Sequence, residues 1–201
     1  MFVQVIQGTV ADAEQVRAAH DRWFEELAPR ASGWLGTVAG VSGAGDFVGL
    51  VRFASEAAAR RQDARQEQVA WWEQSAKLFT GPVRVSGSTN AYADRGGVSD
   101  RAGFVQVIQR RVRDVVRARQ ILKELSPIVA EYRPEDIGTL IVEHDGDRFT
   151  VAVFFTSESA ARGTERQPPP ALKALRAEQN ALGVEPAVFY DLRQPWLWSP
   201  R

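Results

Sequence analysis

A single histidine lies on the apolar face of a helix expected in the first half of the chain. Ala13, Val16, His20, Trp23 and Leu27 follow 3-4-3-4 spacing, which places them on one side of a helix. The pKa of an imidazole lies near neutrality, so His20 could act as a general base toward an activated C–H or O–H group. The alternative interpretation is that His20 is hydrogen-bonded in a hydrophobic core or at its margin.

Tryptophans and one arginine are the other residues whose types could serve a small-molecule site. Trp23, Trp71 and Trp72 could hold a flat aromatic substrate, although tryptophans at helical spacing also serve as core filler. Arg52, within an expected strand, could bind a carboxylate or an enolate. The alternative for Arg52 is that it faces solvent or pairs with a nearby acid.

The sequence segments that are expected to position these residues occur twice in the chain. The segment "FVQVIQ" occurs at 2–7 and again at 104–109, 102 positions later. With the same shift, the pattern F-x-x-x-V-x-F-x-S-E-x-A-A-R fits both 47–60 and 149–162 without a gap. A match of this length indicates an internal duplication. The copies differ in that His20 and Trp23 meet Leu122 and Leu125, so copy one is aromatic and polar where copy two is aliphatic.

Each copy predicts the element order βαββαβ. The first copy predicts strands at 2–9, 34–41, 46–54 and 82–90, with helices over 11–28 and 55–79. The second predicts strands at 103–110, 137–144, 148–156 and 186–192, with helices over 112–131 and 157–182 and a fresh helix start at "PPP", 168–170. Glycine-containing turns, "SGAGD" and "HDGD", close the two hairpins.

The domain boundaries follow from this repeat. We expect a first repeat at 1–92, a polar, Gly-rich linker at 93–102, a second repeat at 103–193 and a tail at 194–201 whose two tryptophans favour packing on a surface. Helices cover only one face of each four-stranded sheet, and "FVQVIQ" is largely apolar on both sides. We therefore expect an α+β fold in which the bare faces of the two ferredoxin-like repeats pack together in a barrel-like core.

The duplicated pattern, with its "FVQVIQ" strands and "WWEQSAKLFTGPVRV" at 71–85, resembles the dimeric α/β-barrel superfamily. More narrowly, the chain is similar to tandem-repeat actinobacterial proteins related to antibiotic-biosynthesis monooxygenase domains. The resemblance implies an intrachain dimeric α/β barrel and a ligand site between sheet and helices. In copy one this site would be lined by Gln4, His20, Trp23, Trp71 and Trp72, with His20 as the catalytic base and Arg52 as a further substrate-binding candidate.

Cofactors are not expected. Haem-degrading relatives need an early-strand Asn and a helical His in the second half of their domain, whereas this chain offers Gln4 or Gln7 and has no His in either second helix. His144 lies in the "EHDGD" turn, where we expect it to be exposed and without a role. This turn lacks the ligand spacing of a calcium loop, and two histidines in unlike settings do not make a metal site. The charge run "ARRQDAR" at 59–65 indicates a solvated helix face.

Composition narrows the partners. Basic and acidic residues balance at 25 each, which disfavours nucleic acid and membrane surfaces, and cysteine is absent. No signal peptide or apolar span is seen, so we expect a cytoplasmic protein. Three classes of function stay open at this stage: a cofactor-independent monooxygenase or isomerase acting on an aromatic or polyketide-like compound, a non-catalytic small-molecule binding or sensing protein, and a structural pseudo-dimer.

The duplication also predicts the oligomeric state. If the two repeats of one chain cover each other's bare sheets, the chain is complete as a monomer, and a homodimer is the next alternative. Light scattering at micromolar concentration should give the mass of one chain or two, whereas an obligate tetramer would contradict this expectation.

Overall fold

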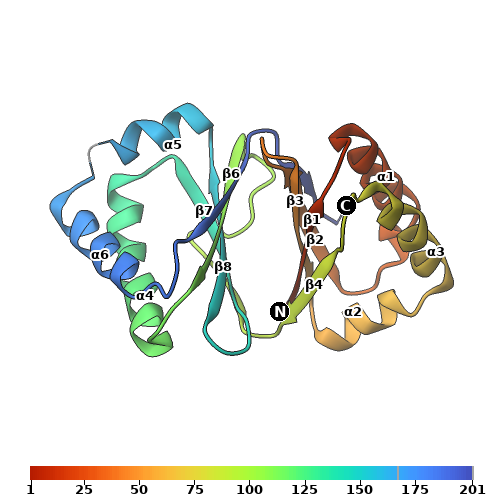
Figure 1. Ribbon diagram of the computed structural model, residues 1–201, viewed down its shortest axis with the longest axis horizontal. Coiled ribbons are helices and arrows are strands. Elements are labelled where there is room, and N and C mark those ends of the chain that lie inside the picture. Colours follow the sequence, from red (N-terminus) through yellow and green to blue (C-terminus); the bar gives the residue numbers. More distant parts are fainter. Residues whose placement is uncertain (167, 201) are drawn as a thin grey trace. The chain divides into compact units, whose positions relative to one another are not determined.

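The computed structural model describes residues 1–166 and 168–200. The chain forms two compact units: unit 1 contains residues 1–91 and the segment from Gln194 onward, and unit 2 contains residues 92–193. Each unit is an antiparallel sheet of five strands whose helices lie on one face (Figure 1). None of the described helices is both long and apolar enough to cross a membrane.

Unit 1 has the sheet order β10-β2-β3-β1-β4. Its elements are β1 (Phe2–Thr9), α1 (Ala13–Glu26), β2 (Trp34–Val41), β3 (Asp46–Phe53), α2 (Glu56–Asp63), α3 (Gln66–Ser75), β4 (Arg84–Ser88) and β10 (Trp196–Trp198), with short 3-10 turns η1 (Ala28–Arg30) and η2 (Ala76–Leu78). Strand β1 pairs with β3 on one side and with β4 on the other, so it lies inside the sheet.

Unit 2 repeats this arrangement with the order β5-β7-β8-β6-β9. Its elements are β5 (Ala91–Asp94), β6 (Phe104–Arg111), α4 (Val115–Tyr132), β7 (Asp136–Glu143), β8 (Arg148–Phe155), α5 (Glu158–Glu165), α6 (Pro170–Ala181) and β9 (Val188–Leu192). The two tandem ferredoxin-like βαββαβ repeats predicted from the sequence are thus confirmed.

The repeat extends to details of local structure. Asp12 and Asp114 cap α1 and α4, each accepting a hydrogen bond from a backbone N–H of the first helical turn. Ser55 and Ser157 do the same for α2 and α5. The register of β2 on β3 shifts between Trp34 and Gly36, and that of β7 on β8 shifts at the equivalent positions 102 residues later. Equivalent sequence positions therefore specify the same helix starts and the same sheet irregularity.

The two hairpin turns form where glycine was expected. Gly45 and Gly146 have φ angles of +84° and +88°, the left-handed conformation that glycine adopts without steric cost. The fresh helix start also occurs where predicted, because α6 begins at Pro170, a residue that suits the first turn of a helix.

One helix prediction was wrong. The stretch over 55–79 is not continuous: α2 ends at Asp63, and α3 begins at Gln66 after Arg65 adopts an extended conformation with ψ of 137°. No glycine or proline marks this break in the sequence, so local propensity could not reveal it. The break reorients the chain between Asp63 and Gln68, both of which line the cavity described below.

The segments outside the two repeats form edge strands. The expected linker contributes to β5, which lies beside β7 at the edge of the unit 2 sheet. The tail contributes β10, which pairs with β2 through Trp196, Leu197 and Trp198. The indole of Trp196 is only 6% exposed, and Trp198 donates a hydrogen bond to Asp21 at 3.1 Å. The end of the chain is therefore an integral part of unit 1.

Removing one tail indole tests this role. Trp196→Ala leaves a void beside Phe47 and Ala39, so we expect the free energy of unfolding to fall by about 3 kcal/mol. Urea denaturation followed by circular dichroism measures the change. Pro200→Ala, at an exposed position beyond the strand, is the control. Equal stability of the two variants would show that β10 does not support unit 1.

Candidate functional site

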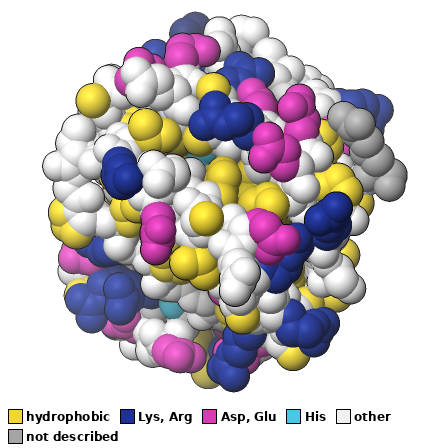
Figure 2. Space-filling model, turned by 90° about the vertical axis from the view of Figure 1, so that its right-hand side faces the viewer, with side chains coloured by type: hydrophobic (Ala, Val, Ile, Leu, Met, Phe, Trp, Pro, Cys, Tyr) yellow, Lys and Arg dark blue, Asp and Glu magenta, His cyan; other side chains and the backbone are white. Residues whose placement is uncertain are grey.

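A cavity of about 300 Å³ lies between the sheet and the helices of unit 1. All three helices and four of the strands contribute to its lining: Gln4, Ile6, His20, Trp23, Thr37, Val51, Phe53, Gln62, Asp63, Gln68, Val69, Trp71, Trp72, Glu73 and Val85. Figure 2 faces the helices of this unit and shows hydrophobic side chains gathered in the middle of the face, with acidic and basic side chains around them. The lining is aromatic and aliphatic with a limited number of polar groups, the composition typical of small-molecule sites.

The structure brings five of the six predicted site residues to this cavity. Gln4 comes from β1, His20 and Trp23 from α1, and Trp71 and Trp72 from α3. Their convergence follows from the helical and strand periods, since α1 and α3 both lie on the sheet face that carries Gln4.

Arg52 is not part of the cavity. Its neighbours Val51 and Phe53 line the cavity, and successive side chains of a strand point to opposite faces of the sheet. Arg52 accordingly lies on the other face, beside Gly36, where a Cβ atom at residue 36 would stand only 2.4 Å from its guanidinium nitrogen. The carboxylate-binding role considered for Arg52 therefore does not apply to this site.

The His20 ring lies among four aromatic rings. Its ring lies 5.7 Å from that of Trp198 in a stacked arrangement with an interplanar angle of 17°, and 5.4 Å from that of Trp71, edge to face. Phe47 and Trp196 are further ring neighbours, at 5.4 and 6.1 Å. The tail strand thus contributes two rings to the surroundings of His20, and the sequence analysis did not connect the tail with the site.

One hydrogen bond defines the protonation of His20. Its Nδ1 lies 2.8 Å from the carbonyl oxygen of Val16, which can only accept, so Nδ1 carries the proton. Burial lowers the pKa of His20 below its ordinary value, although the bond to Val16 and the charge of Asp21 act in the opposite direction. The imidazole is therefore neutral at pH 7, and its Nε2 atom has a free lone pair within the part of the chain that the structure describes.

The N–H groups of two site tryptophans are engaged in hydrogen bonds. Trp23 donates to Gln68 Oε1 at 2.7 Å, and Trp71 donates to the carbonyl of Ala19 at 2.9 Å. The latter bond ties α3 to α1. Because these bonds fix the indoles in place, the rings present flat faces that do not have to be ordered when a ligand binds.

The charge run at 59–65 is a solvated helix face for most of its length, but two of its residues also belong to the cavity. Gln62 is only 3% exposed and donates to Gln68 Oε1 at 2.9 Å. Asp63 accepts a hydrogen bond from Gln4 Nε2 at 2.9 Å, and both of these residues line the cavity. Composition alone could not separate these two residues from the arginines around them, because all belong to one short polar run.

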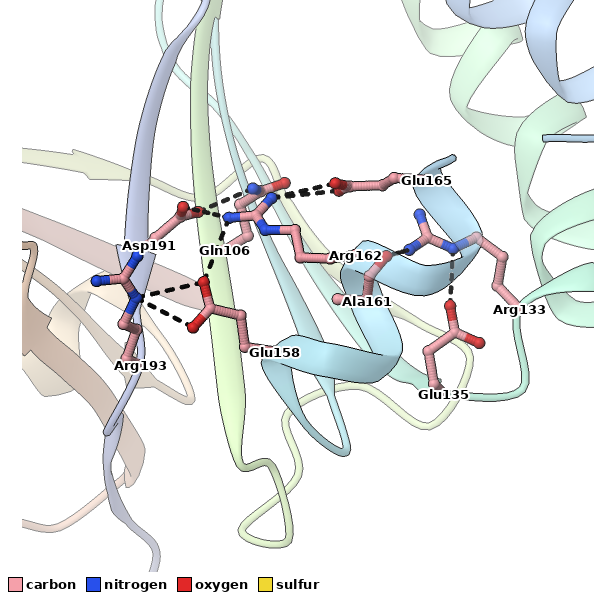
Figure 3. A network of polar contacts seen from close by, with 9 residues as sticks. All are labelled: Gln106, Arg133, Glu135, Glu158, Ala161, Arg162, Glu165, Asp191 and Arg193. Atoms are coloured by element: carbon pink, nitrogen blue, oxygen red, sulfur yellow. Dashed lines mark hydrogen bonds and ion pairs between the residues drawn. The ribbon is translucent and has the colours of Figure 1, made fainter. Parts of the chain in front are cut away.

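The equivalent place in unit 2 carries a network of polar contacts (Figure 3). Arg162 of α5 forms an ion pair with Asp191 of β9, and Gln106, the counterpart of Gln4, donates to the same carboxylate at 2.9 Å. The guanidinium carbon of Arg162 also lies 5.4 Å from the ring centre of Phe104. Leu122, the counterpart of His20, packs against the apolar cluster around Ile141.

One pair of equivalent positions differs in charge between the two units. Asp191 pairs with Gln106 across β9 and β6, and Gly87 pairs with Gln4 across β4 and β1, so the two are equivalent. In unit 1 the counterpart of Arg162 is Arg60, whose side chain is 77% exposed and pairs with Glu56 on its own helix. Gly87 offers Arg60 no carboxylate equivalent to that of Asp191.

Metal ligation is not supported by the side chains described. Among residues 1–166 and 168–200, no group of three or more His, Cys, Asp or Glu side chains could hold a metal ion. His144 is part-buried and lies 2.9 Å from Thr150 Oγ1, which corrects the expectation that it is exposed. The contact gives His144 a local structural role in its hairpin.

Comparisons with known proteins identify the fold. No family model and no curated protein matches this chain. Among solved structures, a candidate monooxygenase from Fusobacterium nucleatum has a TM-score of 0.78 at 8% identity, with 98% of this chain and 94% of the other covered. One from Lactobacillus acidophilus has a TM-score of 0.73 at 13% identity, with coverage of 98% and 99%. An anthrone oxidase-like protein has a TM-score of 0.66 at 14% identity, with coverage of 98% and 92%.

These matches extend over both units. The chain therefore has the tandem ferredoxin-like fold of proteins related to antibiotic biosynthesis monooxygenases, as its sequence resemblance implied. Identities of this size establish the fold alone, so any activity of this chain must be argued from the cavity.

The His20 site makes a prediction about stability. In His20→Leu the Val16 carbonyl keeps its helical hydrogen bond from the residue 20 backbone N–H, so no buried group loses its partner. We expect the free energy of unfolding to stay within about 1 kcal/mol of wild type or to rise. The matched variant Leu122→His places an imidazole in an apolar cluster and should lower the free energy of unfolding by about 1–3 kcal/mol.

The pH dependence of this difference has a defined sign. Because the pKa of His20 is lower in the folded state, the unfolded chain binds a proton more readily. The neutral ring carries no penalty above its unfolded pKa of about 6.5, and stability is lost as the pH falls below that value. Denaturation at about pH 7.5 and about pH 5.5 should therefore show a growing advantage of His20→Leu on acidification. A constant difference would contradict the burial of a neutral ring.

Proposed function

We propose that the unit 1 cavity is the active site of a cofactor-independent monooxygenase for a flat aromatic or polyketide-like compound. The observation that carries this proposal is the state of His20: a neutral imidazole lines the cavity, with Nδ1 donating to Val16 and Nε2 free to accept a proton. Such a group is a general base suited to neutral pH. The names of the solved structures with this fold, monooxygenase and anthrone oxidase-like, support the same class of reaction.

The aromatic walls suit a planar substrate. Trp23, Trp71 and Trp72, together with Phe53, surround a volume of about 300 Å³, which is the size of a small ligand pocket. Burial of a substrate ring among fixed indoles excludes water from the reacting carbon, which strengthens the electrostatic interactions there.

The reaction needs only the substrate and dioxygen. His20 Nε2 takes a proton from an activated CH₂ group, and the resulting carbanion transfers electrons to O₂ as a C–O bond forms. The imidazolium returns its proton to the peroxide, giving a hydroperoxide. Loss of the second C–H proton with cleavage of the O–O bond then yields a ketone and one water, so that one CH₂ and one O₂ give one C=O and one H₂O. The protein's contributions are proton transfer and positioning.

Anthrone is a suitable first probe, because it has an activated CH₂ within a flat ring system. An oxygen electrode should record uptake of one O₂ per anthrone above the rate without protein, with no added metal or cofactor. The rate should fall as the pH drops through a pKa below 6.5, the direction in which burial moves the pKa of His20. His20→Leu should lose the protein-dependent rate while remaining folded, and Leu125→Ala in unit 2 should retain it.

Binding measurements separate this proposal from its alternative. Native mass spectrometry and thermal shift against aromatic metabolites and haem should show one aromatic molecule bound per chain, because the Arg162–Asp191 ion pair lies at the equivalent place in unit 2. Equal oxygen uptake by wild type and His20→Leu would overturn the catalytic role of His20. Aromatic binding without turnover of any bound compound would instead favour a binding or sensing protein.

A further inference from the structure

The hydrogen bonds around the cavity determine which polar atoms remain for a ligand. Trp23 donates to Gln68 Oε1, and Arg65 donates to Gln62 Oε1 at 3.1 Å. Because indole and guanidinium groups only donate, both amide orientations are forced. Gln62 Nε2 then donates to Gln68 Oε1, so the Gln62 side chain has a partner on each atom.

The orientation of the Gln4 amide is likewise determined by its hydrogen-bond partner. Asp63 at neutral pH only accepts, so the atom of Gln4 that contacts it is Nε2, and Gln4 Oε1 is left as an acceptor. His20 Nε2 is a second acceptor, and Asp63 Oδ1 is a third. Among the described residues none of these three atoms has a hydrogen-bond partner. The lining also has donors, namely Gln68 Nε2, the second N–H of Gln4 and of Gln62, the Thr37 hydroxyl and the Trp72 indole N–H.

The charge of the lining discriminates between ligands where the hydrogen-bonding groups do not. Asp63 and Glu73 are both exposed at the cavity and carry negative charge, whereas the described lining residues include no Lys or Arg. Arg65 reaches Gln62 from outside the lining and pairs with Glu67 at 3.7 Å. His20 is neutral. A ligand carboxylate would therefore lose water without meeting a cation, and it would approach two like charges.

We propose that the cavity selects an aromatic ligand that carries no negative charge, with a protonated amine preferred. An ammonium group matches the three free acceptors and the carboxylates of Asp63 and Glu73, and indole faces attract cations. A hydroxyl group satisfies the same acceptors without the charge. This inference rests on the proposed function for the location of the site, but it concerns recognition and not turnover.

Three probes with the same ring system test this preference. Affinities of 2-naphthylmethylamine, 2-naphthalenemethanol and 2-naphthoate are measured at about pH 7.5, where the amine is protonated and the acid is ionised. Titration calorimetry should rank the amine first, the alcohol second and the carboxylate last, with the amine at least about tenfold tighter than the carboxylate. A carboxylate that binds as tightly as the amine would overturn the inference.

A double variant tests whether the carboxylates of the lining cause this preference. The double variant Asp63→Asn with Glu73→Gln should weaken amine binding about tenfold and leave the alcohol nearly unchanged. Asp145→Asn, in the exposed turn of unit 2, is the matched control and should change neither affinity. An unchanged ranking in the double variant would overturn the role of these carboxylates. If the probes bind without ranking by charge, this inference alone fails, whereas absence of binding by all three probes would also remove the proposed active site.

Discussion

The pairing of β10 with β2 is the interaction on which the site of unit 1 depends. Strand β2 would otherwise be an exposed edge, and the last strand of the chain covers it. Alternation along β10 places Trp196 and Trp198 on the helix-covered face, where both rings contact His20. The bond from Trp198 to Asp21 then attaches the strand to α1 itself. One backbone pairing thus positions the rings that hold the candidate base.

The two units have equivalent backbones but different side chains in the space between sheet and helices. They share caps, register shifts and hairpin turns, so their backbones give side chains the same placements. Asp191 at one of these placements attracts Arg162 across the sheet, and the arginine covers Phe104. At the equivalent placement, Gly87 leaves room for the Phe2 ring, which would lie 2.4 Å from a Cβ atom there. The two copies therefore differ at this placement by a carboxylate with an arginine partner and a glycine beside a phenylalanine ring.

Much of this arrangement could be predicted from the sequence, because it follows from periodicity and repetition. The 3-4 spacing of α1 fixed the shared face of Val16, His20 and Trp23, and the duplication fixed the element order. Alternation within β3 could also have shown that Arg52 lies outside the site, because Val51 and Phe53 point to one face of the sheet and Arg52 points to the other. Long-range pairings were different: no local pattern shows that residue 198 stacks on residue 20.

The polar part of the site was hidden for a further reason. Gln62 and Asp63 lie in a run of charged residues, and only the break between α2 and α3 turns them toward Gln4 and Gln68. Their hydrogen bonds serve the fold, because they join α2 and α3 to each other and to β1. Each of these bonds uses one of the two amide hydrogens of Gln4 and of Gln62, and that hydrogen is not available to a ligand. The set of polar atoms that remains for a ligand is therefore a consequence of how the helices are held on the sheet.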